Sequence, residues 1–294
     1  KYMYDIEDYY EADTVADACD LLQKHPGAIL ICGGSDVLIR IREGKLAGSS
    51  LISIRGIRDL HGVSMEKDGT ISIGAAVTFH HLTEDPVIRQ YIPVLSEAAD
   101  QVGGPQIRNI GTIGGNLCNG AVSADSAPAC FCLDARLKIS GPGGERIVPI
   151  KDFYLGPGRV DLRDGEILTR IFIDKKNYEG YTGHYIKYAM RNAMDIAALS
   201  CCVLCRTDLS ARTLNDVKIA FGVAAPTPFR CVETESKLKG IAVDDRLYDK
   251  IEESVRTEIN PRDSWRASRS FRIQIGGEIA RRALQKAVKL QEVR

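Results

Sequence analysis

The sequence lacks an excess of charge of either sign, since Lys plus Arg and Asp plus Glu each number 39 among 294 residues. A chain without net charge has no general attraction for nucleic acid or for an acidic membrane surface, so neither is expected as a partner. Long apolar runs are also missing, because the longest, at 28–32 and 196–205, fall well short of the ~20 residues of a membrane helix. The N-terminal segment is acidic and rich in tyrosine, unlike a signal peptide, so we expect a cytoplasmic protein.

The chain has nine cysteines but lacks an iron-binding cysteine pattern. An iron–sulfur cluster needs several well-spaced cysteines in one loop, whereas Cys201, Cys202 and Cys205 lie in an apolar, strand-like stretch and the others are scattered. An odd number of cysteines cannot be fully paired within one chain, and without a signal peptide the thiols are expected to stay reduced. We therefore predict buried structural thiols and no metal site.

Hydrophobic residues make up 44% of the sequence, enough for a substantial core. Helical and strand-like patterns occur without any repeat, which predicts an α+β fold. Charged and turn-forming residues at 174–183 indicate a connection between two domains. The expected helices cover 14–24, 78–83, 87–102, 247–259 and 271–290, and the expected strands cover 28–32, 50–54, 63–66, 70–73, 137–140, 145–148, 167–173, 185–190, 197–205 and 217–223.

An apolar strand that runs into two glycines forms the first candidate binding motif, Leu30-Ile31-Cys32-Gly33-Gly34-Ser35-Asp36-Val37. Glycine permits positive φ angles and a close approach of the backbone to a ligand, and successive amides can point at an anion. Taken alone, the motif favours an ordinary turn at the end of a strand over a binding site, because such glycine pairs are common there.

A glycine-rich stretch at 103–126 contains the second candidate, Thr112-Ile113-Gly114-Gly115-Asn116. The stretch reads as a loop too long for a simple connector, and its amides, Thr hydroxyl and Asn side chain suit a phosphate. It lacks the lysine of the Walker pattern, and it does not match the dinucleotide fingerprint, because neither glycine pair opens a predicted helix in a parallel strand–helix–strand unit. A purely structural loop is the alternative.

Asp125 is the third candidate, a single carboxylate among the small residues of 119–128. Its oxygens could accept hydrogen bonds from a sugar or from neighbouring amides, although an Asp in a loop usually caps its own backbone. Together, the two glycine pairs suggest a pyrophosphate held between two loops.

The order and spacing of these motifs resemble the FAD subunits of molybdenum hydroxylases, the family of xanthine and carbon monoxide dehydrogenases. The similarity is greatest to the FAD-binding subunits of bacterial three-subunit xanthine dehydrogenases and covers essentially the whole chain. The matching segments are 30–37, 104–109, 112–116, 123–126, 188–191 and 220–228. In one respect the chain departs from the pattern: Val102 stands where some relatives have an aromatic residue near the flavin.

The resemblance implies a two-subdomain FAD-binding domain of the vanillyl-alcohol-oxidase type at 1–176, followed by a C-terminal α+β domain with a small antiparallel sheet at 177–294. The first glycine motif would surround the pyrophosphate and ribityl chain, the second would close over the phosphates, and Asp125 would hydrogen-bond the cofactor. Leu168 and Lys187 match an apolar and a basic flavin contact, with plain core packing and a solvated position as their alternatives. The implied FAD contacts are Leu30, Ile31, Cys32, Gly33, Gly34, Ser35, Asp36, Val37, Thr112, Ile113, Gly114, Gly115, Asn116, Asp125, Leu168 and Lys187.

The resemblance further implies an electron relay. Electrons would pass from a molybdopterin-binding large subunit through a [2Fe-2S] small subunit to FAD in this chain, and then to NAD or another acceptor. The flavin carries out the redox chemistry, so no catalytic residue is assigned. The alternatives are the FAD subunit of a different molybdenum hydroxylase and a stand-alone flavin oxidase of the same fold. None of the five histidines falls in a glycine motif, which counts against the covalent flavin attachment common in such oxidases.

A bulky side chain at Gly114 is expected to abolish FAD retention and to leave the fold largely intact, because it would block the approach of the backbone to the cofactor. Substrate recognition is expected to belong to the molybdenum subunit, so this chain does not identify the substrate.

Overall fold

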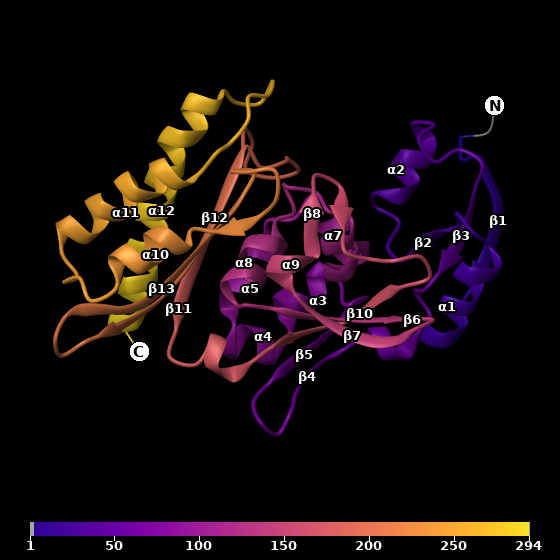
Figure 1. Cartoon of the computed structure of the whole chain (residues 1–294), viewed down its shortest axis with the longest axis horizontal. Helices are drawn as coiled ribbons and strands as arrows, with labels where there is room; N and C mark the ends of the chain where they lie inside the picture. The colour runs from indigo at the N-terminus through magenta and orange to yellow at the C-terminus, as the bar shows by residue number, and fades with distance from the viewer. Residues whose placement is uncertain (1–2, 294) are drawn as a thin grey trace.

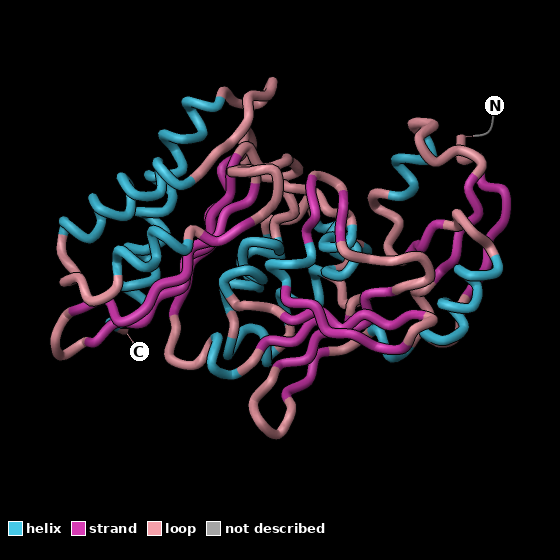
Figure 2. The backbone as a smooth tube through the Cα atoms, in the orientation of Figure 1, coloured by secondary structure: helices cyan, strands magenta, loops and turns pink. Residues whose placement is uncertain are grey.

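The computed structural model describes residues 3–293. Three main β-sheets follow one another along the chain, each with its own helices (Figure 1). Figure 2 shows the strands as three separate groups with helices around them, as expected for an α+β fold. Residues 1, 2 and 294, at the outer ends of the two predicted domains, lie outside the described residues. Among residues 3–293, no helix combines the length and apolar character that a membrane crossing requires.

The N-terminal sheet is parallel and three-stranded, in the order β1-β3-β2, with α1 and α2 connecting successive strands (Figure 1). Thr14 caps α1 by accepting a hydrogen bond from the backbone N–H of Asp17, and Ala18 and Cys19 lie buried on the inner face of the helix. The elements are β1 (Ile6–Glu11), α1 (Val15–Lys24), β2 (Ile29–Ile31), α2 (Val37–Arg42) and β3 (Ser49–Ser53).

The central sheet is antiparallel and five-stranded, in the order β4-β5-β10-β6-β7. Short helices pack with it around one apolar core, to which Ile73, Leu95, Ile113, Phe131 and Ile171 contribute. The elements are η1 (Arg58–Leu60), β4 (Val63–Met65), β5 (Ile71–Gly74), α3 (Phe79–Glu84), α4 (Pro86–Tyr91), α5 (Pro93–Asp100), α6 (Pro105–Ile110), α7 (Ile113–Cys118), α8 (Ser126–Cys132), β6 (Arg136–Gly141), β7 (Gly144–Pro149), α9 (Ile150–Phe153), the hairpin of β8 (Tyr154–Gly156) and β9 (Arg159–Val160), and β10 (Ile167–Ile173).

The C-terminal sheet is antiparallel, in the order β11-β12-β13-β14, and α10, α11 and α12 cover one of its faces (Figure 1). Side chains of β12 alternate between two cores: Cys201 and Cys205 lie under these helices, whereas Cys202 lies in the core of the central helices. Burial on both faces explains the continuous apolar run in the sequence. The elements are η2 (Lys175–Asn177), β11 (Thr182–Tyr188), β12 (Leu199–Asp208), β13 (Thr213–Gly222), β14 (Phe229–Arg230), α10 (Val232–Leu238), α11 (Asp245–Glu258) and α12 (Arg269–Glu292).

The cysteines confirm the prediction of structural thiols. Seven are buried, and the other two, Cys32 and Cys118, are half-buried; all are unpaired. Burial raises the pKa of the Cys118 and Cys130 thiols to about 12, so they remain protonated at neutral pH. They act as small apolar side chains in the core.

Partly buried charges join the C-terminal sheet to the central helices. Asp134, two residues after the end of α8, accepts hydrogen bonds from Lys218 of β13 at 2.8 Å and from Arg230 of β14 at 2.5 Å. Arg230 also forms two bonds with Glu235 of α10, at 2.9 and 2.6 Å. Buried charges need a partner of opposite charge, and each of these has one. The ion pairs hold the C-terminal sheet against α8.

Short elements such as α2, α8 and α10 were not expected from the sequence, and three further differences have clear causes. Residues 103–126 are not one loop, because they contain α6 and α7, each of six residues and too short to show a helical period. The helix expected over 87–102 is broken at Pro93, which lacks an amide hydrogen and begins α5. Strand β1 was not expected, because it lies at a sheet edge with mostly exposed side chains and shows no apolar alternation.

Candidate functional site

The two glycine motifs lie against each other. Gly33 follows β2, Ile110 ends α6, and Gly111 lies between α6 and α7. A Cβ atom on Gly33 would lie 1.8 Å from the carbonyl oxygen of Ile110 and 3.2 Å from the backbone nitrogen of Gly111. Only glycine permits so close an approach of two backbones. The contact joins the N-terminal sheet to the central helices at the place where both motifs occur.

The first motif presents backbone donors without partners. Among the hydrogen bonds within residues 3–293, none is donated by the N–H groups of Gly33, Gly34, Ser35 or Asp36. Gly34 has a left-handed φ of 70°, which turns the chain from β2 toward α2. Successive unpaired N–H groups in such a turn form a concave anion-binding site.

The first motif also opens a helix in a parallel strand–helix–strand unit, formed by β2, α2 and β3. The contrary prediction from the sequence is wrong. Helix α2 has only six residues, too few to show a helical period in the sequence.

The flanks of the first motif are half-buried: Leu30 and Ile31 lie in β2, Cys32 follows them, and Val37 begins α2. Burial raises the pKa of the Cys32 thiol, and nearby Arg55 opposes this effect only in part. The thiol is therefore protonated at neutral pH and serves as a packing group.

The second motif has no unpaired amides at 113–116. The N–H groups of Ile113, Gly114 and Asn116 donate to the carbonyls of Val77, Ala75 and Thr112 at 3.0, 2.9 and 3.0 Å, and that of Gly115 donates to the Thr112 hydroxyl at 3.1 Å. The expectation of an amide cradle here is wrong, because this segment starts α7 and its amides bond within the protein. The exposed backbone of Gly115 and the side-chain NH₂ of Asn116 remain for a ligand, whereas the Asn116 Oδ1 accepts a hydrogen bond from the Ser126 hydroxyl at 2.7 Å.

Gly114 is required for packing. A Cβ atom there would lie 2.5 Å from the carbonyl oxygen of Ala75 and 2.6 Å from the Ala75 Cβ. A larger residue would push α7 away from the end of β5. We therefore expect a bulky residue at Gly114 to destabilise the fold as well as to impair FAD retention, contrary to the expectation of a largely intact fold.

Asp125 and Lys187 form a buried ion pair with an Nζ–Oδ2 distance of 2.8 Å, and their side chains are 8% and 6% exposed. The other carboxylate oxygen of Asp125 accepts a hydrogen bond from the Tyr185 hydroxyl at 2.7 Å. Lys187 also donates to the backbone carbonyl of Gln101 at 2.9 Å. The alternatives left by the sequence are thus excluded for these two residues, because the Asp125 side chain does not cap α8 and Lys187 is not solvated.

Burial dominates the electrostatics of this group. It raises the pKa of the Asp125 carboxyl, and the hydrogen bonds and charge of Lys187 and Tyr185 oppose the rise. Burial also raises the pKa of Tyr185 well above its ordinary value, with Asp125 adding to the effect, so the Tyr185 hydroxyl stays a donor. The Asp125 carboxyl group is thus held by two side chains of β11, Tyr185 and Lys187.

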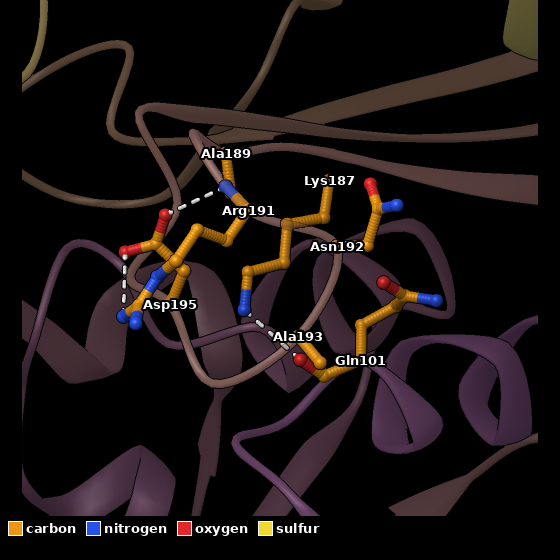
Figure 3. Close-up of a pocket in the computed structure, with 7 residues that line it drawn as sticks. All are labelled: Gln101, Lys187, Ala189, Arg191, Asn192, Ala193 and Asp195. Atoms are coloured by element: carbon orange, nitrogen blue, oxygen red, sulfur yellow. Dashed lines mark hydrogen bonds and ion pairs between the residues drawn. The ribbon is translucent and has the colours of Figure 1, made fainter.

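A small polar cavity of about 120 Å³ adjoins the ion pair (Figure 3). Figure 3 shows Lys187 extending toward Gln101, beside the loop that carries Ala189 to Asp195 between β11 and β12. The backbone N–H of Met194 donates to the carbonyl of Gly103 at 3.2 Å, which attaches this loop to the segment before α6. The loop thereby holds the ion pair and the cavity against the glycine-rich stretch at 103–126, which we call the second glycine segment.

Leu168 lies apart from these polar groups. It pairs with Ile139 in the central sheet, and its buried side chain belongs to the central core. Val102 belongs to the same core. Any contact of Leu168 with a ligand would therefore use its backbone, and the assignment of this residue stays a prediction.

Sequence reasoning missed Tyr185 and Gln101, and it gave the loop at 189–195 no role beyond the family match at 188–191. A signal existed for Tyr185, because residues two apart on a strand share a face, which places it beside Lys187. No signal existed for Gln101, which contributes a backbone carbonyl. Within residues 3–293, no group of three or more His, Cys, Asp or Glu is arranged to hold a metal ion.

Comparison with known proteins gives matches along the whole chain. A family model described as the FAD binding domain in molybdopterin dehydrogenase matches residues 3–175, and one described as the CO dehydrogenase flavoprotein C-terminal domain matches residues 184–287. The chain is 40% identical to the xanthine dehydrogenase FAD-binding subunit of Escherichia coli O157:H7 over 286 residues, which is 97% of each protein. It is 31% identical to the carbon monoxide dehydrogenase medium chain of Afipia carboxidovorans over 95% of this chain and 96% of that one.

Solved structures share the same fold. A Cu,Mo-CO dehydrogenase chain superposes with a TM-score of 0.91 at 28% identity, over 97% of this chain and 99% of that one. Quinoline 2-oxidoreductase from Pseudomonas putida 86 gives a TM-score of 0.90 at 24% identity, a likeness of fold alone. The predicted fold class is confirmed.

Proposed function

Since this chain belongs to the FAD-binding flavoproteins of the molybdopterin dehydrogenases, we propose that it relays electrons from a [2Fe-2S] subunit through FAD to NAD. The resemblance found in the sequence is thus confirmed, and with it the assignment of FAD to this chain. The acceptor and the direction of electron flow are the parts that we propose.

The observation that carries the proposal is the run of unpaired N–H groups at Gly33 to Asp36, in contact with the second glycine segment. These residues suit the pyrophosphate of FAD, because successive amides neutralise an anion without a lysine. The Asn116 side chain and the Lys187 ammonium would supply further donors. When bound, FAD accepts and releases the electrons, and the protein provides binding and orientation.

Partners are proposed from the relatives. Those described above are named as a subunit and as a medium chain, so each is one part of a larger enzyme. We propose a molybdopterin-binding large subunit and a [2Fe-2S] small subunit as the partners of this chain. The identity of 40% to a xanthine dehydrogenase subunit favours a purine as the substrate of the whole enzyme.

A stand-alone flavin oxidase fits the histidines poorly. His61 bonds the backbone carbonyl of Arg55, His81 pairs with Asp85, and His184 pairs with Glu97. His25 stacks on Tyr10. Each of these four has a partner outside the glycine motifs, and the fifth, His80, lies in α3, so none is placed for covalent flavin attachment there.

The acceptor can be tested with the purified, FAD-loaded chain, reduced chemically without oxygen and mixed with NAD⁺. We expect the absorbance of oxidised flavin to return as NADH fluorescence appears, because the relay ends on NAD. A dye acceptor serves as the control. Reoxidation by the dye but never by NAD⁺, in the chain and in its complex, would contradict NAD as the acceptor and leave FAD binding unaffected.

A further inference from the structure

Asp125 occupies the N-cap position of α8, yet its side chain makes no capping hydrogen bond. An Asp at this position ordinarily accepts bonds from the first N–H groups of its helix. Here both carboxylate oxygens turn instead to β11, one to Tyr185 at 2.7 Å and the other to Lys187 at 2.8 Å. The Asp125 side chain therefore contacts the C-terminal sheet instead of capping α8.

Lys187 is fixed in direction by these contacts. An ammonium group has three donors. Two of them are used, by Asp125 at 2.8 Å and by the Gln101 carbonyl at 2.9 Å. Lys187 also lines the cavity beside the loop at 189–195 (Figure 3), so its remaining donor is available to a group on that side.

Tyr185 is held rigidly behind this pair. It is buried in β11, and its backbone N–H donates to the Glu97 carboxylate at 3.1 Å. The same carboxylate oxygen of Glu97 pairs with His184 at 3.0 Å, which anchors the strand to α5. The Tyr185 hydroxyl therefore meets Asp125 from a fixed backbone, and it can orient the carboxylate.

We propose that Tyr185 is a positioning residue that acts through Asp125 to aim the Lys187 ammonium at the flavin. The inference rests on the proposed binding of FAD beside Lys187. With one oxygen of Asp125 occupied by Tyr185, the carboxylate cannot give both oxygens to Lys187. The ammonium keeps a donor and part of its field for the flavin. A cation near a flavin favours its reduced, more negative form.

A Tyr185→Phe variant tests this role. Without the hydroxyl, Asp125 binds Lys187 more fully, and the Lys187 ammonium loses its hydrogen bond to the flavin. We therefore expect about fivefold weaker FAD binding, the usual effect of one lost hydrogen bond. We also expect a lower midpoint potential of the bound flavin, measured by equilibration with redox dyes. Tyr178→Phe is the matched control, because it also removes a hydroxyl bond, to the Gly69 carbonyl at 2.6 Å, on a different element and outside the ion pair.

A double-variant cycle separates positioning from a general loss of packing. If Tyr185 acts through Asp125, Tyr185→Phe changes the midpoint potential in the wild-type background and leaves it unchanged in an Asp125→Asn background. An equal shift in both backgrounds, or no shift in either, would overturn the inference. Should Tyr185→Phe fail to fold as an isolated chain, the same variants in the complete enzyme complex provide the comparison. A wild-type chain that takes up no FAD would overturn the proposed function itself.

Discussion

A Gly33→Ala variant is expected to bind FAD about ten- to a hundredfold more weakly than the wild-type chain, the equivalent of about 1–3 kcal/mol of overpacking. The added Cβ would lie 1.8 Å from the Ile110 carbonyl oxygen, so the two backbones must separate. Separation displaces the unpaired N–H groups at Gly33 to Asp36 from the second glycine segment. The ligand then loses the relative placement of the two sides of its site.

The measurement is a fluorescence titration of apoprotein with FAD, beside a thermal melt. Gly56→Ala is the control, because a Cβ there meets no atom within 4 Å and Gly56 has no positive φ. We expect wild-type affinity for this control. Unchanged FAD affinity in a folded Gly33→Ala variant would contradict the placement of the cofactor at this contact.

A Lys187→Met variant is expected to lose about 3–5 kcal/mol in the free energy of unfolding, because it leaves Asp125 as a buried charge with one donor. The side chains of the pair are only 6% and 8% exposed, so solvent cannot replace the lost partner. Lys239→Met is the matched control. Lys239 pairs with Asp216 at 2.6 Å but is 54% exposed, so we expect a loss of less than about 1 kcal/mol.

The pH dependence of the Lys187→Met deficit gives an independent check. Burial already raises the pKa of Asp125, and without Lys187 it rises further. A carboxyl whose pKa is higher in the folded than in the unfolded state binds its proton more tightly when folded, so acid favours folding of the variant. The deficit should therefore shrink as pH falls through the raised pKa of Asp125. Adding Asp125→Asn to Lys187→Met should recover most of the lost stability at neutral pH. A deficit that changes neither with pH nor with Asp125→Asn would show that the ion pair is not its cause.

The sequence was sufficient to find both glycine motifs, because close backbone approach needs glycine whatever the surrounding fold. Gly33 meets the backbone of Ile110 and Gly111, one residue before the second motif. The sequence could not show which of the two motifs has unpaired backbone N–H groups. The N–H groups of Ile113 and Gly114 are used by the carbonyls of Val77 and Ala75, and such tertiary partners leave no local pattern.

The ion pair illustrates the same limit. Asp125 and Lys187 were singled out by family resemblance, and each had a plausible local alternative, capping or solvation. The structure excludes both alternatives by pairing the two residues across 62 positions. Tyr185 went unnoticed, although the period of two along β11 already placed it beside Lys187.

The most direct test of the account is the flavin content of the chain. Apoprotein should take up about one FAD per chain, with the absorbance of a bound flavin and quenched fluorescence, because both glycine segments and the Lys187 pair are in place. Saturation at that stoichiometry, weakened by Gly33→Ala and not by Gly56→Ala, is the predicted result. A folded, colourless protein that takes up no FAD, alone or with its partner subunits, would contradict the central claim.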